Sequence, residues 1–230
     1  MDWPDYMVNT PRDEYLEKDH RQAVMKTRDR ILVTSLELFN EFGEPNVTTI
    51  HIADEMDISP GNLYYHFRNK NEIIYELYQQ FEKRMNEILV APPEDRQITM
   101  EDHWLFVHLL FEHIWEYRFI YRNLPDLLAS VDKLATHFNR ILDKKERVNK
   151  AICEGLIANG TMLASLEEVN SLSQNITMTM TYWLNYENVR NKGKHTEDLG
   201  KGVYQVMSLL TPYLEPTHRA FMQDLSKKYL

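Results

Sequence analysis

The residues best suited to specific chemistry lie in residues 59–67, where several side chains can hydrogen-bond to phosphates and base edges. Asn62 can bond to adenine through two hydrogen bonds, and the Pro60 ring can pack on a thymine methyl group. Leu63 and Phe67 are four residues apart, so both are expected to face inward. The pattern predicts a short helix whose outward face contacts DNA; its other outward residues are Gly61, Tyr64, Tyr65 and His66.

Two short helices joined by a tight turn are expected to position this face. Thr48 or Thr49 is a good N-cap for the first helix, and Ser59 followed by Pro60 is a strong start for the second. Such a pair forms a helix-turn-helix, whose second helix fits the major groove of DNA. The start of the first helix, with Thr48, Thr49 and His51, has free N–H groups that suit a phosphate. The alternative is a helix pair in any α-helical protein.

The stretch from Ile31 to Phe81 resembles the N-terminal domain of the tetracycline-repressor (TetR/AcrR) family of bacterial transcriptional regulators. The matching segments are ILVTSLELFNEFG, TTIHIADEMDIS and PGNLYYHFRNKNEIIYEL, and the most specific part is residues 63–70. The rest of the chain resembles the family only in length and helical layout. The resemblance implies that Tyr64 and Lys70 contact DNA phosphates. Asp57 departs from the glycine that the family often has in the turn.

The resemblance and the helical periodicity together predict an all-α fold in three parts. Residues 1–22 are an N-terminal extension, residues 23–90 a three-helix DNA-binding domain with a connecting helix, and residues 91–230 a helical domain for ligand binding and dimerisation. The Pro-rich segment 91–97 marks the boundary between the domains. The extension lacks periodicity and is expected to be frayed. A sharper hypothesis is an arm that enters the minor groove, with Arg12 or Arg21 as the inserted residue.

The charge of the chain argues against a general polyanion binder. The 230 residues carry a net charge of −9, and residues 21–90 hold eight Lys and Arg against eleven Asp and Glu. A basic footprint is typical of nucleic-acid-binding proteins, so the sequence predicts modest non-specific affinity and heavy reliance on specific contacts. The alternative function is a helical small-molecule-binding protein whose DNA binding is weak or lost.

The location of the protein follows from two absences in the sequence. No run of about eighteen apolar residues is present, so no membrane span is expected. The N-terminus lacks the charged-then-apolar layout of a secretory signal. We therefore expect a cytoplasmic protein with no membrane partner.

Large aromatic and methionine side chains in residues 91–230 are candidates for a ligand pocket between helices. Methionine adapts to irregular cavities, and apolar pockets favour apolar small molecules. The expected effector is thus a small, largely apolar molecule, acyl or aromatic. The alternative is an ordinary helical core. The candidate pocket residues are Trp104, His108, Phe111, Trp115, Met178 and Trp183.

A homodimer on a palindromic operator is expected, because one helix-turn-helix contacts only a few base pairs and two-fold pairing doubles the contacts. The family resemblance implies that the two last long helices, residues 166–188 and 196–211, pair with their copies in a four-helix bundle. Gly200 and Gly202 would then allow close approach of the partner. An exposed N-terminal helix turn explains the two glycines equally well.

No group of residues in the sequence points to catalysis. His103, His108 and His113 are five residues apart, which places them about 140° apart around a helix. His108 with Glu112 could supply two metal ligands, but a third is not evident. Cys153 lies in an apolar helical pattern and is expected to be a buried, inert thiol. We expect no enzyme, metal or cofactor; a metal-dependent helical enzyme is the remaining alternative.

Overall fold

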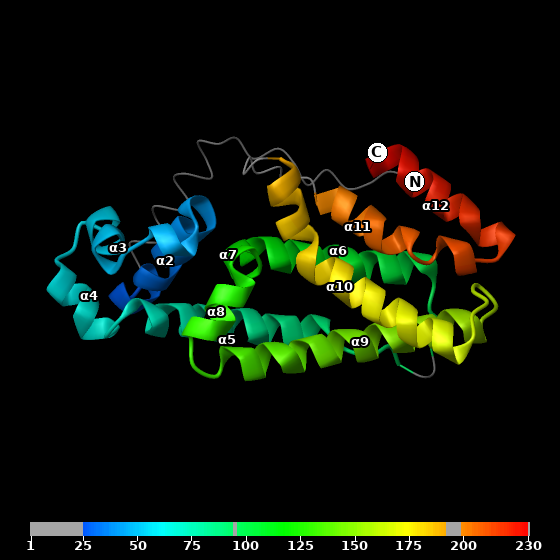
Figure 1. Cartoon of the computed structure of the whole chain (residues 1–230), viewed down its shortest axis with the longest axis horizontal. Coiled ribbons are helices and arrows are strands. Elements are labelled where there is room, and N and C mark those ends of the chain that lie inside the picture. Colours follow the sequence, from blue (N-terminus) through cyan, green and yellow to red (C-terminus); the bar gives the residue numbers. More distant parts are fainter. Residues whose placement is uncertain (1–24, 94–95, 192–198, 230) are drawn as a thin grey trace. The chain divides into compact units, whose positions relative to one another are not determined.

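The computed structural model describes residues 25–93, 96–191 and 199–229, apart from the side chains of residues 225 and 226. Within these ranges the regular elements are α-helices and short 3-10 helices, as Figure 1 shows. The prediction of an all-α fold is confirmed. The N-terminal extension, with Arg12 and Arg21, lies outside the described residues.

The chain divides into two compact units, the first ending at Ile73 and the second beginning at Ile74. The described part of the first unit contains three helices that share one core, followed by the start of α5. Leu38, Ile52, Leu63 and Phe67 are all buried in that core. The three helices are α2 (Thr27–Phe42), α3 (Thr49–Glu55) and α4 (Pro60–His66), with a short 3-10 helix, η1 (Glu44–Asn46), after α2. The helix that follows, α5 (Lys70–Ile88), continues into the second unit.

The second unit is a helical bundle in which α9 and α10 are the longest elements and pack along one another (Figure 1). α11 packs on α6 and α12. A capping box of Ser165 and Glu168 is present at the start of α10. The helices are α6 (Met100–Glu116), α7 (Arg118–Arg122), α8 (Leu124–Ser130), α9 (Leu134–Ala158), α10 (Leu166–Arg190), α11 (Leu199–Ser208) and α12 (Arg219–Tyr229).

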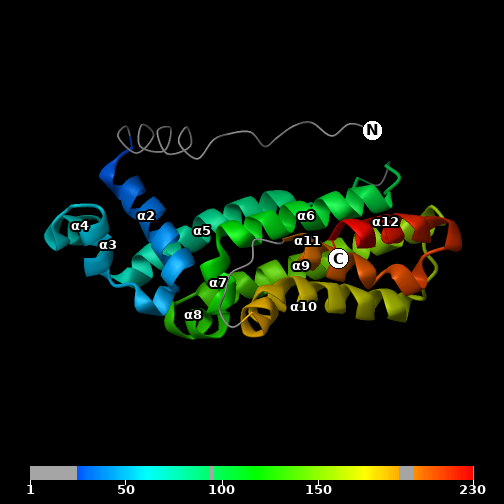
Figure 2. The same cartoon turned by 90° about the horizontal axis from the view of Figure 1, so that it is seen from above.

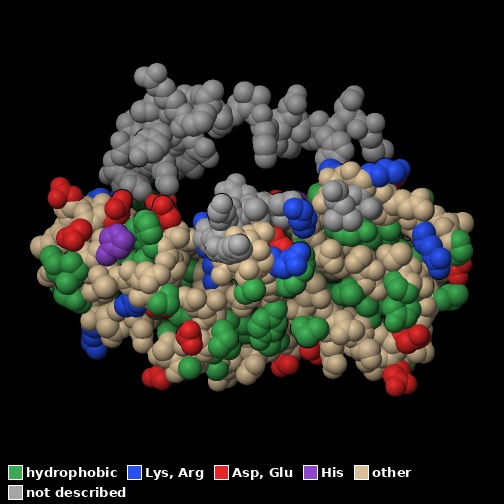
Figure 3. Space-filling model, turned by 45° about the horizontal axis from the view of Figure 1, so that its top comes forward, with side chains coloured by type: hydrophobic (Ala, Val, Ile, Leu, Met, Phe, Trp, Pro, Cys, Tyr) green, Lys and Arg blue, Asp and Glu red, His purple; other side chains and the backbone are tan. Residues whose placement is uncertain are grey.

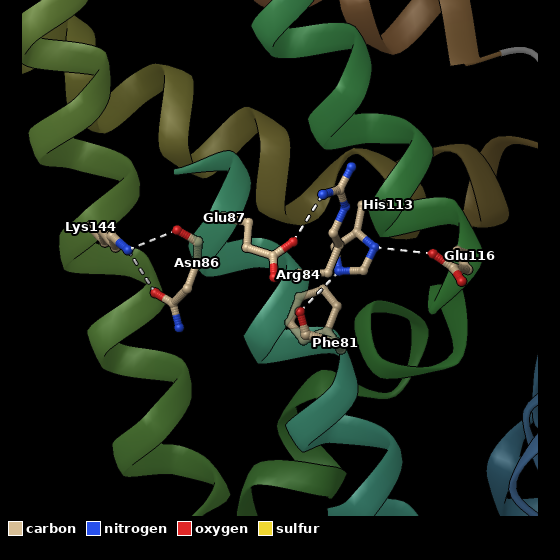
Figure 4. A network of polar contacts seen from close by, with 7 residues as sticks. All are labelled: Phe81, Arg84, Asn86, Glu87, His113, Glu116 and Lys144. Atoms are coloured by element: carbon tan, nitrogen blue, oxygen red, sulfur yellow. Dashed lines mark hydrogen bonds and ion pairs between the residues drawn. The ribbon is translucent and has the colours of Figure 1, made fainter. Parts of the chain in front are cut away.

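The division between the units falls inside α5, between Ile73 and Ile74. The cause is the packing of the C-terminal half of α5, which lies beside α6 in Figure 2. There the His113 ring of α6 donates a hydrogen bond from Nε2 to the Phe81 carbonyl over 2.9 Å. On the other side, Lys144 of α9 donates to the backbone and side-chain oxygens of Asn86, 3.1 and 2.8 Å away (Figure 4). α5 is therefore held between α6 and α9.

None of the helices in the described ranges has the length and hydropathy that crossing a lipid bilayer requires.

Candidate functional site

The turn between α3 and α4 is built from local capping contacts. Thr48 is the N-cap of α3, and its hydroxyl accepts from the His51 N–H over 3.1 Å. Ser59 caps α4 in the same way, accepting from the Asn62 N–H over 3.2 Å. Asp57 has a φ of 53°, the left-handed conformation that aspartate tolerates better than most residues. The predicted helix-turn-helix geometry is confirmed, with Asp57 in place of the usual glycine.

The outward face of α4 presents side chains that make few contacts within the chain. Tyr65 is 85% exposed and Tyr64 is 47% exposed, whereas Leu63 and Phe67 are buried as predicted. His66 is half-buried, with its ring centroid 5.1 Å from that of Tyr65. We call the exposed residues the α4 surface; they are Pro60, Gly61, Asn62, Tyr64 and Tyr65.

Gly61 lies on the α4 surface where the chain itself does not require a glycine. Among the described residues, and apart from its chain neighbours and the backbone of α4, a Cβ atom at this position would have only the Ser59 Oγ within 4 Å, at 3.9 Å. The residue is helical, and its φ is not among the positive values of the described residues. A side chain at this position would therefore matter only to a molecule that approaches the surface from outside.

A hydrogen bond fixes the α4 surface to the start of α3. The Thr49 Oγ1 and the Tyr64 hydroxyl are 2.9 Å apart, and either group can be the donor. This contact brings the expected phosphate site at Thr48, Thr49 and His51 next to the predicted phosphate contact Tyr64. The start of α3 and Tyr64, both predicted from the sequence to contact phosphates, are thus adjacent.

Lys70 makes contacts within the chain that the sequence did not predict. Its ammonium donates to the carbonyl oxygens of Glu44 and Val47 over 3.0 and 3.1 Å, and lies 2.7 Å from the Glu44 carboxylate. These three contacts use the three donors of a lysine. Lys70 thereby fixes the segment that leads into Thr48, and the phosphate contact expected of it would compete with these bonds.

Exposed carboxylates lie on the helix before α4 and in the turn that leads to it. The exposed residues of α3 and the following turn include Asp54, Glu55 and Asp57, and acidic side chains are visible on the first unit in Figure 3. α4 itself contains no carboxylate. Contacts by its surface would therefore depend on hydrogen bonds and apolar packing more than on net attraction.

Among the described residues, the six candidate pocket residues have different surroundings. Trp104 and His108 stack on each other within α6, with ring centroids 5.3 Å apart. Phe111 and Trp183 both lie within 3 Å of the position that a Cβ of Gly202 would occupy. The Trp115 ring lies under Arg118, whose guanidinium carbon is 4.7 Å from the ring centroid.

Met178 was expected in the ligand pocket, but it is 57% exposed on α10. Its position follows from the helical repeat, because residues 178, 182, 186 and 189 are spaced by four, four and three and share one face. All four are apolar or aromatic and exposed: Met178, Tyr182, Tyr186 and Val189. We call them the α10 surface.

The expectation that Gly200 and Gly202 contact a partner subunit is corrected by the packing inside the chain. Both glycines are buried in α11. A Cβ at Gly200 would come within 2.2 Å of the Tyr229 ring of α12, and one at Gly202 within 2.7 Å of the Trp183 ring of α10. These distances are too short for any side chain. The glycines are therefore required by close packing within one chain.

The histidines and the cysteine have separate environments. The His108 Nε2 lies 3.2 Å from the Glu112 carboxylate, and His113 is buried against Phe81. His103 is buried elsewhere on α6. Cys153 is buried, and burial raises the pKa of its thiol to about 12. The thiol therefore stays protonated at neutral pH, and Cys153 is unreactive as expected.

Comparison with known proteins agrees with the geometry of the first unit. Residues 31–77 match the family model described as bacterial regulatory proteins, tetR family, and residues 80–221 match the model described as bacterial transcriptional repressor. The probable acrEF/envCD operon repressor of Escherichia coli K12 is 29% identical over 65 residues. That match covers 28% of this chain and only 30% of the repressor's length.

Solved structures extend the similarity to nearly the whole chain. A TetR-family transcriptional regulator from Marinobacter aquaeolei VT8 is 41% identical, with a TM-score of 0.80 and coverage of 89% of this chain and 99% of that one. SmeT in complex with triclosan shares the fold at 15% identity, with a TM-score of 0.53 and coverage of 83% and 92%. Because the second family model matches more than half of the chain, the protein belongs to the TetR family of bacterial transcriptional regulators.

Proposed function

We propose that this chain is a transcriptional repressor that binds a palindromic operator as a homodimer and is released by a small, largely apolar effector. The observation that carries the proposal is the α4 surface, because a capped helix presents hydrogen-bonding and aromatic side chains that the fold itself leaves exposed. Family members regulate transcription and are not enzymes, and no catalytic role is proposed for this one.

The start of α3 and the neighbouring Tyr64 are proposed to bind the phosphates of the DNA backbone. The start of α3, with Thr48, Thr49 and His51, binds a phosphate through its free N–H groups, and Tyr64 contacts the phosphate beside it. Phosphate contacts of this kind fix the register of the protein on the duplex. Lys70 supports them from behind by holding the segment before Thr48.

The other outward residues of α4 are proposed to recognise the bases. Asn62 bonds to an adenine, and the Pro60 ring packs on a thymine methyl group. Tyr65 and His66 contact the groove beside them. Gly61 has no side chain, which allows the helix backbone to come close to the DNA. Specific contacts of this kind compensate for the net negative charge of residues 21–90.

Dimerisation is proposed to use the α10 surface. A row of exposed apolar side chains along two to three helical turns is uncommon on a monomer and typical of a protein interface. Figure 3 shows hydrophobic side chains gathered in several places on the second unit. Two copies of α10 that pack through this row would hold two α4 surfaces for the two halves of a palindrome.

Release by an effector is proposed to act through α5. This helix begins at Lys70, beside the helix-turn-helix, and its other half is held between α6 and α9. An effector that binds one position of α5 better than another would change the fraction of molecules competent for DNA. SmeT, which shares the fold, was solved with triclosan, a precedent for a small ligand in such a bundle.

The second candidate is a small-molecule-binding protein with weak or lost DNA binding, which the exposed carboxylates of residues 54, 55 and 57 favour. A gel-shift titration on the DNA upstream of the chain's own gene separates the two. The repressor is expected to give a discrete complex at nanomolar protein that survives excess unrelated DNA. A complex that competitor DNA abolishes would favour the second candidate and contradict the first.

A further inference from the structure

A cavity of about 350 Å³ lies in the second unit, between the C-terminal end of α5, residues 90–93 and 96–98, α6 and α9. Its walls are mainly apolar, and its volume is within the range of small-molecule sites. None of the six pocket candidates from the sequence lines it. Apolar side chains from each bordering element contribute to it, among them Ile88, Pro92, Phe106, Leu109 and Ile152.

One polar side chain in this lining has no hydrogen-bond partner among the residues that the structure describes. His103 is 1% exposed, and neither of its ring nitrogens has a hydrogen-bond partner among the described residues. Burial lowers the pKa of His103 to about 4, so the ring is neutral at pH 7, with one nitrogen as donor and the other as acceptor. Buried polar groups without a partner are rare because each costs about 1–3 kcal/mol. The ring thus has an unused bonding capacity at the wall of the cavity.

The charged residues of the cavity already compensate one another. The Arg84 guanidinium lies 2.9 Å from the Glu87 carboxylate, and Arg96 forms a close ion pair with Asp102. Figure 4 shows Arg84 and Glu87 pointing toward one another from α5. Among the described lining residues no cation is thus left for an anionic ligand, and a charged group would lose its hydration without gaining a counter-ion. The site favours a neutral molecule.

We propose that this cavity binds a neutral, mainly apolar molecule that carries one hydroxyl group, and that the hydroxyl hydrogen-bonds to the ring of His103. The apolar body of the ligand lies against the side chains from α6 and α9 and against Val90, Pro92 and Ile98. A hydroxyl both donates and accepts, so it can bond to either nitrogen of the neutral imidazole once the ring turns toward the ligand.

The place of the cavity also gives the ligand a regulatory role, and this part rests on the proposed function. Arg84, Glu87 and Ile88 come from the last turns of α5, and His113 and Lys144 hold the same part of the helix. A ligand there contacts α5, α6 and α9 at once. The bound ligand therefore favours one position of α5 relative to α6 and α9. Because α5 begins at Lys70, beside the helix-turn-helix, this preference can affect DNA binding.

The test uses two probes of the same shape, 1-naphthol and naphthalene, titrated into the full chain without DNA. We expect wild type to bind 1-naphthol on the order of 2- to 10-fold more tightly than naphthalene, the fold-change that one net hydrogen bond gives. In His103→Phe the two probes should bind equally, because a ring of similar size remains without its nitrogens. Failure of wild type to bind either probe, or a naphthol preference that persists in His103→Phe, would overturn the proposal.

Two further variants locate the probes. Leu109→Trp fills the cavity from a partly exposed position and should remove binding of both probes. Leu163→Trp places the same side chain at an exposed position outside the cavity lining and should leave binding unchanged. Undiminished naphthol binding in Leu109→Trp would show that the probe lies elsewhere and would refute the site.

DNA binding is measured separately, so that the two proposals can fail independently. If 1-naphthol binds as expected and weakens the DNA complex of wild type but not of Leu109→Trp, the regulatory role is supported. If the probe binds as expected and the DNA complex is unaffected, the regulatory role is wrong while the binding site remains. If wild type forms no DNA complex, the proposed function is wrong. The binding site is then tested by the probe titrations alone.

Discussion

The Lys70 ammonium lies 2.7 Å from the Glu44 carboxylate, and it also bonds the carbonyl oxygens of Glu44 and Val47. The pair is only partly exposed, at 26% for the lysine side chain and 11% for the glutamate. One lysine thereby ties the start of α5 to the segment that leads into α3. Residues 63–70, the most specific part of the family resemblance, end at Lys70. Within the chain, Lys70 has a structural role.

Lys70→Met should therefore destabilise the first unit, because it leaves the Glu44 carboxylate partly buried without its cation. We expect a loss of about 1–3 kcal/mol in the free energy of unfolding. The slope of log affinity for DNA against log salt concentration should stay unchanged. Thermal unfolding and a salt series of DNA titrations measure the two quantities, with Lys70→Met/Glu44→Gln as the control that regains part of the stability. A slope lower by about one, with unchanged stability, would instead show a phosphate contact.

Gly61→Ala separates DNA binding from folding. Alanine is favoured over glycine in a helix by about 0.5–1 kcal/mol, and the added Cβ meets only the Ser59 Oγ at 3.9 Å. The variant should thus be as stable as wild type or more stable, while its affinity for the operator falls. Gly160→Ala is the matched control: Gly160 has a φ of 77°, so alanine should lower the melting temperature and leave DNA affinity unaltered. Full DNA affinity in Gly61→Ala would mean that the backbone of α4 does not approach the duplex.

Tyr186→Glu introduces a charge into the α10 surface, where Tyr186 is half exposed. Two copies of the glutamate would face each other across a two-fold interface, so the dimer should dissociate at micromolar protein and DNA affinity should fall steeply. Sedimentation measures the oligomeric state, and Gln80→Glu puts the same charge on an exposed position of α5 as a control. A variant that remains dimeric would place the interface elsewhere.

Lys145→Met should stabilise the second unit at neutral pH. Lys145 is fully buried, its ammonium donates to the Tyr121 hydroxyl over 3.2 Å, and burial lowers its pKa to about 7. An unfolded lysine titrates near 10.4, so between pH 7 and 10 the unfolded chain binds more protons and wild-type stability rises with pH. The advantage of the variant should hence be largest at pH 7 and below and shrink toward pH 10.

Denaturant unfolding at several pH values measures this difference, with the half-buried Lys150→Met on the same helix as the control. A gap between wild type and Lys145→Met that is constant with pH would show that the ammonium is not destabilised by burial.

The local features of the helix-turn-helix could be predicted from the sequence because each depends on neighbours in the chain. Ser59 and Pro60 start α4, Thr48 caps α3, and Asp57 takes the left-handed turn. The all-α fold followed from the same periodicity. These predictions needed no knowledge of distant contacts.

Features that depend on residues far apart in sequence were missed. Lys70 is committed to Glu44, 26 residues earlier, and Gly202 is required by rings from α6 and α10. The cavity at His103 combines α5, α6, α9 and residues 90–93 and 96–98, which lie far apart in the sequence. The histidine itself stood out in the sequence, but only the packing shows that its ring is buried and without a partner.

The central claim is that α4 enters a groove of a two-fold-symmetric operator. A hydroxyl-radical footprint of the DNA upstream of the gene tests it most directly, with wild type, Asn62→Ala and Tyr65→Ala, and with Gln79→Ala on α5 as the control. The account predicts two protected patches related by two-fold symmetry, with centres about 10 base pairs or a multiple of that apart, lost in the two α4 variants and kept in the control. A single unsymmetrical patch, or protection that survives both α4 substitutions, would contradict it.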